Sequence, residues 1–135
     1  MTTFRAAIEA HDMAAVDDLL AEDVVFRSPV AFKPYPGKAI TSAILRAVAE
    51  VFQDFHYVRE IRDPNGVDHA LVFAAKVEDL EITGCDFLRY DADGKIVDFM
   101  VMVRPLRAAE ALSRQMAARF EQIQANAIAA VTKAR

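Results

Sequence analysis

The segment from Leu80 to Arg104 constrains the fold more than any other part of the sequence. Two apolar-rich runs, Leu80 to Tyr90 and Lys95 to Arg104, flank the four residues Asp91-Ala92-Asp93-Gly94. Aspartate and glycine at these positions favour a tight turn, and the flanking runs are rich in residues that form strands. The segment therefore predicts a long antiparallel hairpin at the centre of a sheet.

Further strands are predicted before this hairpin. Phe55 to Arg62 alternates in polarity, Asp63-Pro64-Asn65-Gly66 is a strong turn signal, and Leu71 to Val77 is a mostly apolar run. A brief strand from Val24 to Ser28 ends at Pro29. Because the later strands follow one another with only turns between them, they predict an antiparallel meander.

Helical spacing of apolar residues precedes the meander. Residues 3 to 20 predict two short helices with a break at His11-Asp12, where Asp12 suits an N-cap. The loop from Pro29 to Gly37 holds three prolines and excludes a helix, whereas Lys38 to Phe52 keeps its apolar residues on one face. We therefore expect an α+β fold, in which N-terminal helices close an apolar pocket over a cone-shaped, curved antiparallel sheet.

The C-terminal segment predicts a long helix. Pro105 can stop the sheet and open the helix, and no glycine or proline follows it. One stripe of apolar residues at spacings of three and four would lie on the sheet or on a partner subunit: Leu106, Ala109, Leu112, Met116, Phe120, Ile123, Ala127 and Val131. We treat residues 1–135 as one domain, with 121–135 as a helical extension. Fraying of this helix past about residue 125 stays an open alternative.

Composition narrows the partners and the compartment. The formal net charge is -4, and no cluster of lysine and arginine suits a nucleic acid or an anionic membrane surface. The longest apolar runs are too short to span a bilayer. Cys85 is the one cysteine, which is consistent with a reducing compartment, and Arg5, Glu9 and Asp12 interrupt any signal-peptide core. We expect a cytoplasmic protein.

The apolar content of 54% is high for a soluble domain. The surplus apolar side chains are usually accommodated in a self-associating face or around an internal cavity. The strand from Ile96 to Val103 is apolar on both sides, whereas a strand with one wet face would alternate. One face would line a pocket under the helices, and the other, bearing Met100 and Met102, would contact a second copy. This predicts a homodimer packed through the outer sheet face.

Two segments carry a family resemblance: FRAAIEAHDMAAVDDLLAEDVVFRSPV near the start and GCDFLRYDADGKIVDFMVMVRP later in the chain. In their order and spacing they resemble the nuclear transport factor 2-like superfamily, and more narrowly its branch of ketosteroid isomerases and SnoaL-like polyketide cyclases. The resemblance covers roughly residues 3 to 120. It implies a cone-shaped fold with a deep pocket, and commonly a dimer, but this superfamily hosts enzymes, binders and scaffolds alike.

The resemblance also implies three catalytic positions. Ketosteroid isomerases need a carboxylate base just before a proline, a tyrosine on the first helix, and a carboxylic acid kept neutral by an apolar site. Ser28, Phe4 and Asp86 occupy these positions here. A serine without a neighbouring base cannot take a carbon-bound proton near neutral pH, and Phe4 cannot donate to an oxyanion. Steroid isomerisation by that mechanism is therefore not expected.

Asp86 is the best single candidate for chemistry, because its neighbours are apolar and the resemblance points it inward. A buried carboxyl group without a cationic partner has a raised pKa and can act as a general acid or donate to a carbonyl. The alternative is a structural pair with Arg89, Arg27 or a backbone amide. SnoaL-like enzymes can use an inward histidine with an aspartate, which makes His56 the second catalytic candidate.

Strand alternation and the resemblance together predict the ligand-binding residues: Phe4, Ile8, Ser28, Leu88, Tyr90, Phe99, Val101 and Val103. The alternative is that these side chains simply fill a core. A site with so many apolar side chains suits a flat hydrophobic ligand. His11, His56 and His69 have no mutual ligand spacing, so no metal site is expected, and no cofactor.

We therefore expect a SnoaL-like protein that binds a small hydrophobic carbonyl compound. Any reaction would be a cofactor-free isomerisation, cyclisation or hydration. Two alternatives come from other classes of protein. The first is a non-catalytic binding or carrier protein, which keeps the pocket without a base. The second is a dimeric interaction module whose C-terminal helix is the working part.

Overall fold

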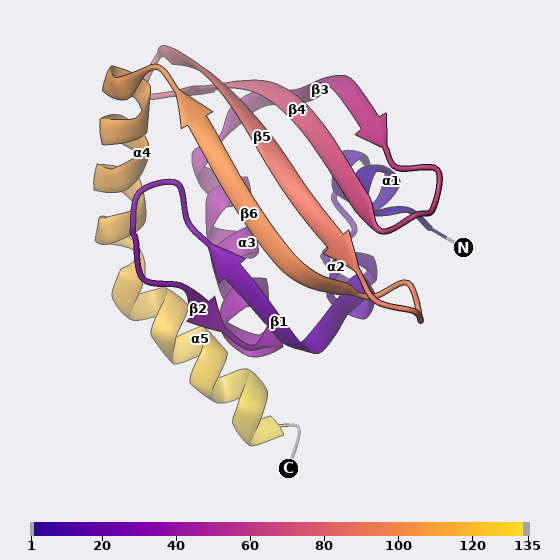
Figure 1. The fold of residues 1–135 in the computed structure, drawn as a ribbon. Helices are drawn as coiled ribbons and strands as arrows, with labels where there is room; N and C mark the ends of the chain where they lie inside the picture. The colour runs from indigo at the N-terminus through magenta and orange to yellow at the C-terminus, as the bar shows by residue number, and fades with distance from the viewer. Residues whose placement is uncertain (1, 134–135) are drawn as a thin grey trace.

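The computed structural model describes residues 2–133 and has eleven elements of secondary structure. Six strands form one curved, unclosed sheet in the order β2-β1-β6-β5-β4-β3, and α1, α2 and α3 cover one side of it (Figure 1). In chain order the elements are α1 (Phe4–Glu9), α2 (Met13–Leu19), β1 (Leu20–Arg27), β2 (Tyr35–Pro36), α3 (Lys38–Val51), β3 (Gln53–Arg62), β4 (Asp68–Val77), β5 (Leu80–Tyr90), β6 (Ile96–Arg104), α4 (Leu106–Ala118) and α5 (Phe120–Lys133). The α+β fold expected from the sequence is confirmed.

The meander forms as its turn residues predict. In the β5–β6 turn the amide of Gly94 donates to the Asp91 carbonyl over 3.0 Å, and Gly94 has a φ of 78°. In the β3–β4 turn the Gly66 amide donates to the Asp63 carbonyl over 2.9 Å. Strands β3 to β6 are antiparallel neighbours, whereas β1 pairs with β6 in parallel. The sequence did not indicate this parallel pair, because the polarity pattern of one strand does not identify the strand with which it pairs.

The N-terminal helices also follow local signals. Thr3 caps α1 by accepting from the Ala6 amide over 3.1 Å, and Asp12 caps α2 by accepting from the Ala15 amide over 3.1 Å. His11 has a φ of 55° between the two helices. The predicted break at His11-Asp12 is therefore confirmed, and it bends the chain so that both helices cover the same end of the sheet (Figure 1).

The C-terminal helix is divided at Arg119, where the sequence predicts one continuous helix. The Arg119 amide bonds to the carbonyl of Met116, which closes α4 before α5 begins. The apolar stripe therefore has two partners. In α4 the buried Leu112 lies against the sheet, and in α5 the buried Ile123 and Ala127 lie against α3. No glycine or proline marks the break. Within residues 2–133, no helix is long and apolar enough to cross a membrane.

The face of the sheet away from the helices is apolar at its centre. Paired rows place Phe87 beside Met100 and Cys85 beside Met102, and the Met102 side chain is 53% exposed. The opposite residues, such as Asp86 and Val101, form the concave face under the helices. The sheet thus has the two apolar faces that the β6 sequence predicts, while the homodimer stays a prediction.

Candidate functional site

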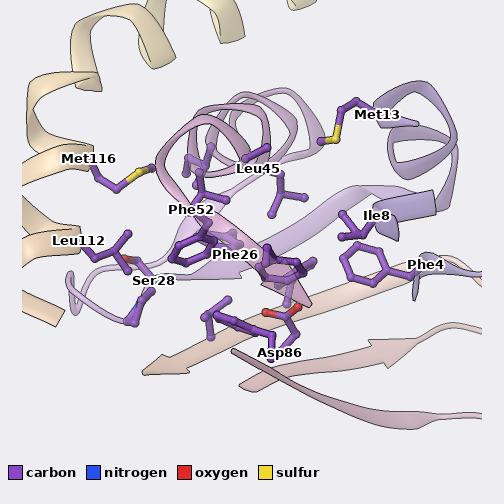
Figure 2. Close-up of a pocket in the computed structure, with 18 of the residues that line it drawn as sticks. Phe4, Ile8, Met13, Phe26, Ser28, Leu45, Phe52, Asp86, Leu112 and Met116 are labelled. Atoms are coloured by element: carbon purple, nitrogen blue, oxygen red, sulfur yellow. The ribbon is translucent and has the colours of Figure 1, made fainter. Parts of the chain in front are cut away.

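A pocket lies between the concave face of the sheet and α3, and it is also bounded by α1, α2 and α4 (Figure 2). Its cavity volume is about 120 Å³, and its walls are almost entirely apolar. Side chains from β1, β3, β4, β5 and β6 form its floor. The polar side chains that line it are His11, Ser28, Tyr57 and Asp86.

Asp86 occupies the middle of β5, with Leu71 and Val101 as its neighbours on the adjacent strands. Its carboxyl group points from the sheet toward the helices (Figure 2), and the residue is only 7% exposed. Burial raises the pKa of this carboxyl group from 3.8 to about 7. Among residues 2–133 no side chain or backbone amide bonds to it. At neutral pH the site therefore holds a carboxyl group with a large protonated fraction.

The structural alternative for Asp86 does not hold. The Arg89 guanidinium bonds to Asp68 over 3.1 Å, and that of Arg27 bonds to Asp98 over 3.2 Å. These pairs lie on the outer face of the sheet, because Asp68, Arg89 and Asp98 are neighbours there. Neither arginine is available to neutralise Asp86.

Tyr57 on β3 is a polar lining residue that the sequence did not single out. Its ring is buried, and its hydroxyl group has no hydrogen-bond partner in the described part of the chain. Burial, and next the charge of Asp86, raise the pKa of Tyr57 above its ordinary value. The hydroxyl group therefore stays protonated and is free to donate a hydrogen bond.

The expected inward orientation of His56 is wrong. His56 is exposed on the outer side of the sheet opposite Ala74, and its Nδ1 lies 2.9 Å from the carbonyl oxygen of Asp54. It does not line the pocket that holds Asp86. Adjacent residues of a strand face opposite sides, so the inward position belongs to Tyr57. Phe55 is apolar and lies two residues before Tyr57, so it was the sequence signal that the odd-numbered residues of this strand segment face the pocket.

An aromatic wall holds Tyr57 in place. The ring of Phe55 lies 5.1 Å from that of Tyr57 and 4.9 Å from that of Phe73, measured between ring centres. Phe73 can lie flat on the sheet because Gly84 faces it on β5, where an added Cβ would stand 2.2 Å from the Phe73 Cζ atom. Gly84 is thus required for the close approach that shapes this wall.

Most of the predicted ligand-binding residues line the pocket: Phe4, Ile8, Ser28, Phe99 and Val101. Leu88, Tyr90 and Val103 do not, although they face the same side of the sheet. Leu88 is buried in the core, the Tyr90 hydroxyl lies 2.8 Å from His69 Nδ1, and Val103 packs in the cluster around α4. Alternation predicts the face of a strand, but it does not predict where along the strand a pocket ends.

His11 lines the pocket from the corner between α1 and α2, and it is exposed on its other side. The sequence marked this residue only as a helix boundary. Ser28 also lines the pocket, and its Oγ accepts a hydrogen bond from the Val30 amide over 3.1 Å. Within residues 2–133 no three His, Cys, Asp or Glu side chains gather in a way that could hold a metal ion.

Comparisons with known proteins support the fold. The chain is similar to a steroid delta-isomerase from Pseudomonas aeruginosa, with 42% identity, a TM-score of 0.84, and 90% of this chain and 89% of that chain covered. It is also similar to an uncharacterized protein with a cystatin-like fold from Silicibacter pomeroyi DSS-3, with 32% identity, a TM-score of 0.80, and coverage of 91% and 90%.

A more distant structure, the epoxide hydrolase/cyclase-like enzyme SalBIII, is 14% identical with a TM-score of 0.62 over 78% of this chain and 87% of that chain, and it shows a shared fold alone. No curated protein sequence matches the chain significantly. The family model of the SnoaL-like domain matches residues 1–99. The chain therefore belongs to the SnoaL-like family.

Proposed function

We propose that this protein binds a small apolar carbonyl compound whose oxygen accepts hydrogen bonds from Tyr57 and protonated Asp86. The observation that carries the proposal is that both groups are buried at one apolar pocket and have no partner among the described residues. An unsatisfied buried polar group costs roughly 1–3 kcal/mol. Two such groups at the same pocket are explained if a ligand satisfies them.

The chemistry of the two groups favours a carbonyl oxygen. A neutral carboxyl group and a phenol each donate one hydrogen bond, and a carbonyl oxygen can accept two. Among residues 2–133 no lysine or arginine lines the pocket, so these residues offer an anionic ligand no counter-charge. A cationic amine would instead pair with ionised Asp86, and its affinity would rise with pH, whereas the affinity of a ketone would fall.

The size of the pocket limits the part of the ligand that it encloses. A cavity of about 120 Å³ is close to the engineered apolar cavity of about 150 Å³ that binds benzene. The enclosed part of a ligand is therefore about one ring. Any larger portion would extend toward the exposed lining residues His11 and Val30.

The same arrangement supports enolisation of the bound ketone. Donors on the carbonyl oxygen stabilise the negative charge that develops when a neighbouring carbon loses a proton. His11 lines the pocket, and a neutral imidazole is a common proton acceptor. The 42% identical relative that is named as a steroid delta-isomerase supports this class of reaction. We propose cofactor-independent proton transfer of this kind as the activity.

Binding is tested with acetophenone labelled with ¹³C at its carbonyl carbon. Donation by Tyr57 and Asp86 is expected to move the bound carbonyl resonance downfield at pH 6. The shift should shrink in Tyr57→Phe and in Asp86→Asn. Tyr35→Phe and Asp93→Asn are matched controls, because both residues lie outside the pocket lining. A bound probe with the same resonance in all five proteins would refute the proposal.

Catalysis is tested by following the methyl hydrogens of acetophenone in D₂O. His11 takes a proton, and the electrons of the broken C–H bond form the enolate. The protonated imidazole exchanges that proton for a deuteron from the solvent and returns the deuteron to the same carbon, which regenerates neutral His11 and the ketone. Exchange faster than in buffer, and reduced in His11→Gln and Asp86→Asn, is expected for an enzyme. Binding without accelerated exchange would favour the carrier protein.

The outer face supports a proposal on assembly. Its central residues, among them Phe87, Met100 and Met102, are apolar, and the ion pairs of Arg27 with Asp98 and of Arg89 with Asp68 lie at one border. An apolar centre with a polar rim is the usual anatomy of a protein interface. We propose that a second copy of the chain covers this face as a two-fold dimer.

A further inference from the structure

Arg5 on α1 connects the pocket to a set of polar side chains outside it. Its Nη1 donates to Glu60 Oε1 over 2.9 Å, and its Nε donates to Glu9 Oε1 over 3.3 Å. The guanidinium carbon lies 5.6 Å from the centre of the Tyr57 ring. A guanidinium group at this distance over an aromatic face is attracted by the π electrons. Arg5 is therefore fixed on both sides, by carboxylates and by the ring.

Glu60 is itself held from the other side. His69 is buried, its Nε2 lies 2.7 Å from Glu60 Oε2, and its Nδ1 lies 2.8 Å from the Tyr90 hydroxyl. The hydrogen bond with His69, followed by that with Arg5, lowers the pKa of Glu60. The carboxylate therefore stays charged and keeps its hold on Arg5.

A shift in strand register makes this arrangement geometrically feasible. In a regular strand, residues three apart face opposite sides of the sheet. The pairing of β3 with β4 shifts between Tyr57 and Arg59, so that Tyr57 pairs with Phe73 and Glu60 pairs with Leu71. Both partners lie on the concave face. The irregularity thus brings the anchoring carboxylate to the same face as the ring.

We propose that Arg5 is a positioning residue for ligand recognition, which holds the Tyr57 ring and strengthens its hydroxyl group as a donor to the ligand oxygen. This inference rests on the proposed function, in which Tyr57 donates to a carbonyl. A positive charge beside a phenol favours loss of its proton and so makes the O–H group a stronger donor. Without Arg5, the charges of Glu9 and Glu60 would act on Tyr57 unopposed and weaken the donor.

The chain offers a matched control for this role. The guanidinium carbon of Arg62 lies 5.5 Å from the centre of the Tyr90 ring, which is nearly the same geometry. Tyr90 bonds to His69 and lies outside the pocket lining. Replacement of Arg62 therefore measures the effect of removing an arginine from a tyrosine ring that does not line the pocket.

The experiment measures the affinity and the carbonyl resonance of ¹³C-labelled acetophenone in full-length variants. Arg5→Met is expected to raise Kd about three- to fivefold and to move the bound resonance toward its free value. Arg5→Lys, which keeps the charge, should restore most of the shift, and Arg62→Met should leave both readouts unchanged. If Arg5→Met does not fold, Arg5→Gln keeps a donor toward Glu60 without the charge and gives the same readouts.

Two results would overturn the inference: a wild-type resonance in Arg5→Met, or an equal change in Arg62→Met. Tyr57→Phe separates this failure from failure of the proposed function. If Tyr57→Phe changes the resonance and Arg5→Met does not, only the role of Arg5 is refuted. If neither Tyr57→Phe nor Asp86→Asn has an effect, the carbonyl site itself is refuted.

Discussion

Replacement of Asp86 by asparagine is expected to stabilise the protein at and above neutral pH. Burial raises the pKa of the Asp86 carboxyl group from 3.8 to about 7 in the folded chain, while the unfolded chain keeps the ordinary value. Between these two values the folded state holds a proton that the unfolded state releases. The contribution of Asp86 to stability is therefore most favourable below about pH 4 and is lost as pH rises to about 7.

The magnitude follows from the two pKa values. They differ by about three pH units, and each unit corresponds to about 1.4 kcal/mol. Ionisation of Asp86 at pH 8 therefore costs about 4 kcal/mol of unfolding free energy. This is large beside the 5–15 kcal/mol that typically stabilises a whole domain. Asparagine does not ionise, so the variant lacks this pH-dependent loss.

Urea unfolding of both proteins between pH 4 and pH 8 measures the difference. The unfolding free energy of Asp86→Asn relative to wild type should rise by about 4 kcal/mol across this range, with most of the change between pH 4 and pH 7. Asp93→Asn, an exposed change in the β5–β6 turn, should follow the wild-type curve. Parallel curves for wild type and Asp86→Asn would refute the reasoning, because they would mean that Asp86 is solvated or paired.

Three further changes probe the wall, the outer face and the C-terminal helix. Gly84→Ala places a Cβ 2.2 Å from Phe73 Cζ, so thermal unfolding should show a loss of about 1–3 kcal/mol and acetophenone should bind more weakly. Met102→Lys puts a charge on the outer face, so sedimentation at micromolar concentration should show a monomer. This monomer should still bind acetophenone. A monomeric wild-type protein would contradict the dimer. Ile123→Ala removes a buried contact between α5 and α3 and should cost about 2–4 kcal/mol in urea unfolding; no loss would mean that α5 is not docked.

The sequence could predict the features that local chemistry decides. Gly66 and Gly94 mark turns and Asp12 marks a helix start, whereas the inward direction of Asp86 was implied by the family resemblance. The features that depend on distant parts of the chain could not be predicted in this way. The parallel pairing of β1 with β6 has no local signal, and α4 ends at Arg119 without a glycine or proline.

The candidate site shows the same division between local and distant causes. Tyr57 was missed because His56 and Tyr57 alternate, and the sequence did not decide which of them faces inward. The shift in register after Tyr57 then brings Glu60 to the concave face, contrary to simple alternation. Leu88 has the predicted face and lies beyond the pocket, because the helices that close the cavity decide its length.

The three functional alternatives make different demands on the pocket. An interaction module does not use it, so exchanging Asp86 for an apolar residue would only remove the cost of a buried carboxyl group. A carrier protein needs Asp86 and Tyr57 as donors but no proton acceptor. An enzyme needs His11 as well, at the edge of the same cavity. Because a chain that never fills its pocket gains nothing from two unpaired polar groups there, their presence argues for a ligand, and loss of exchange in His11→Gln would then distinguish the enzyme from the carrier.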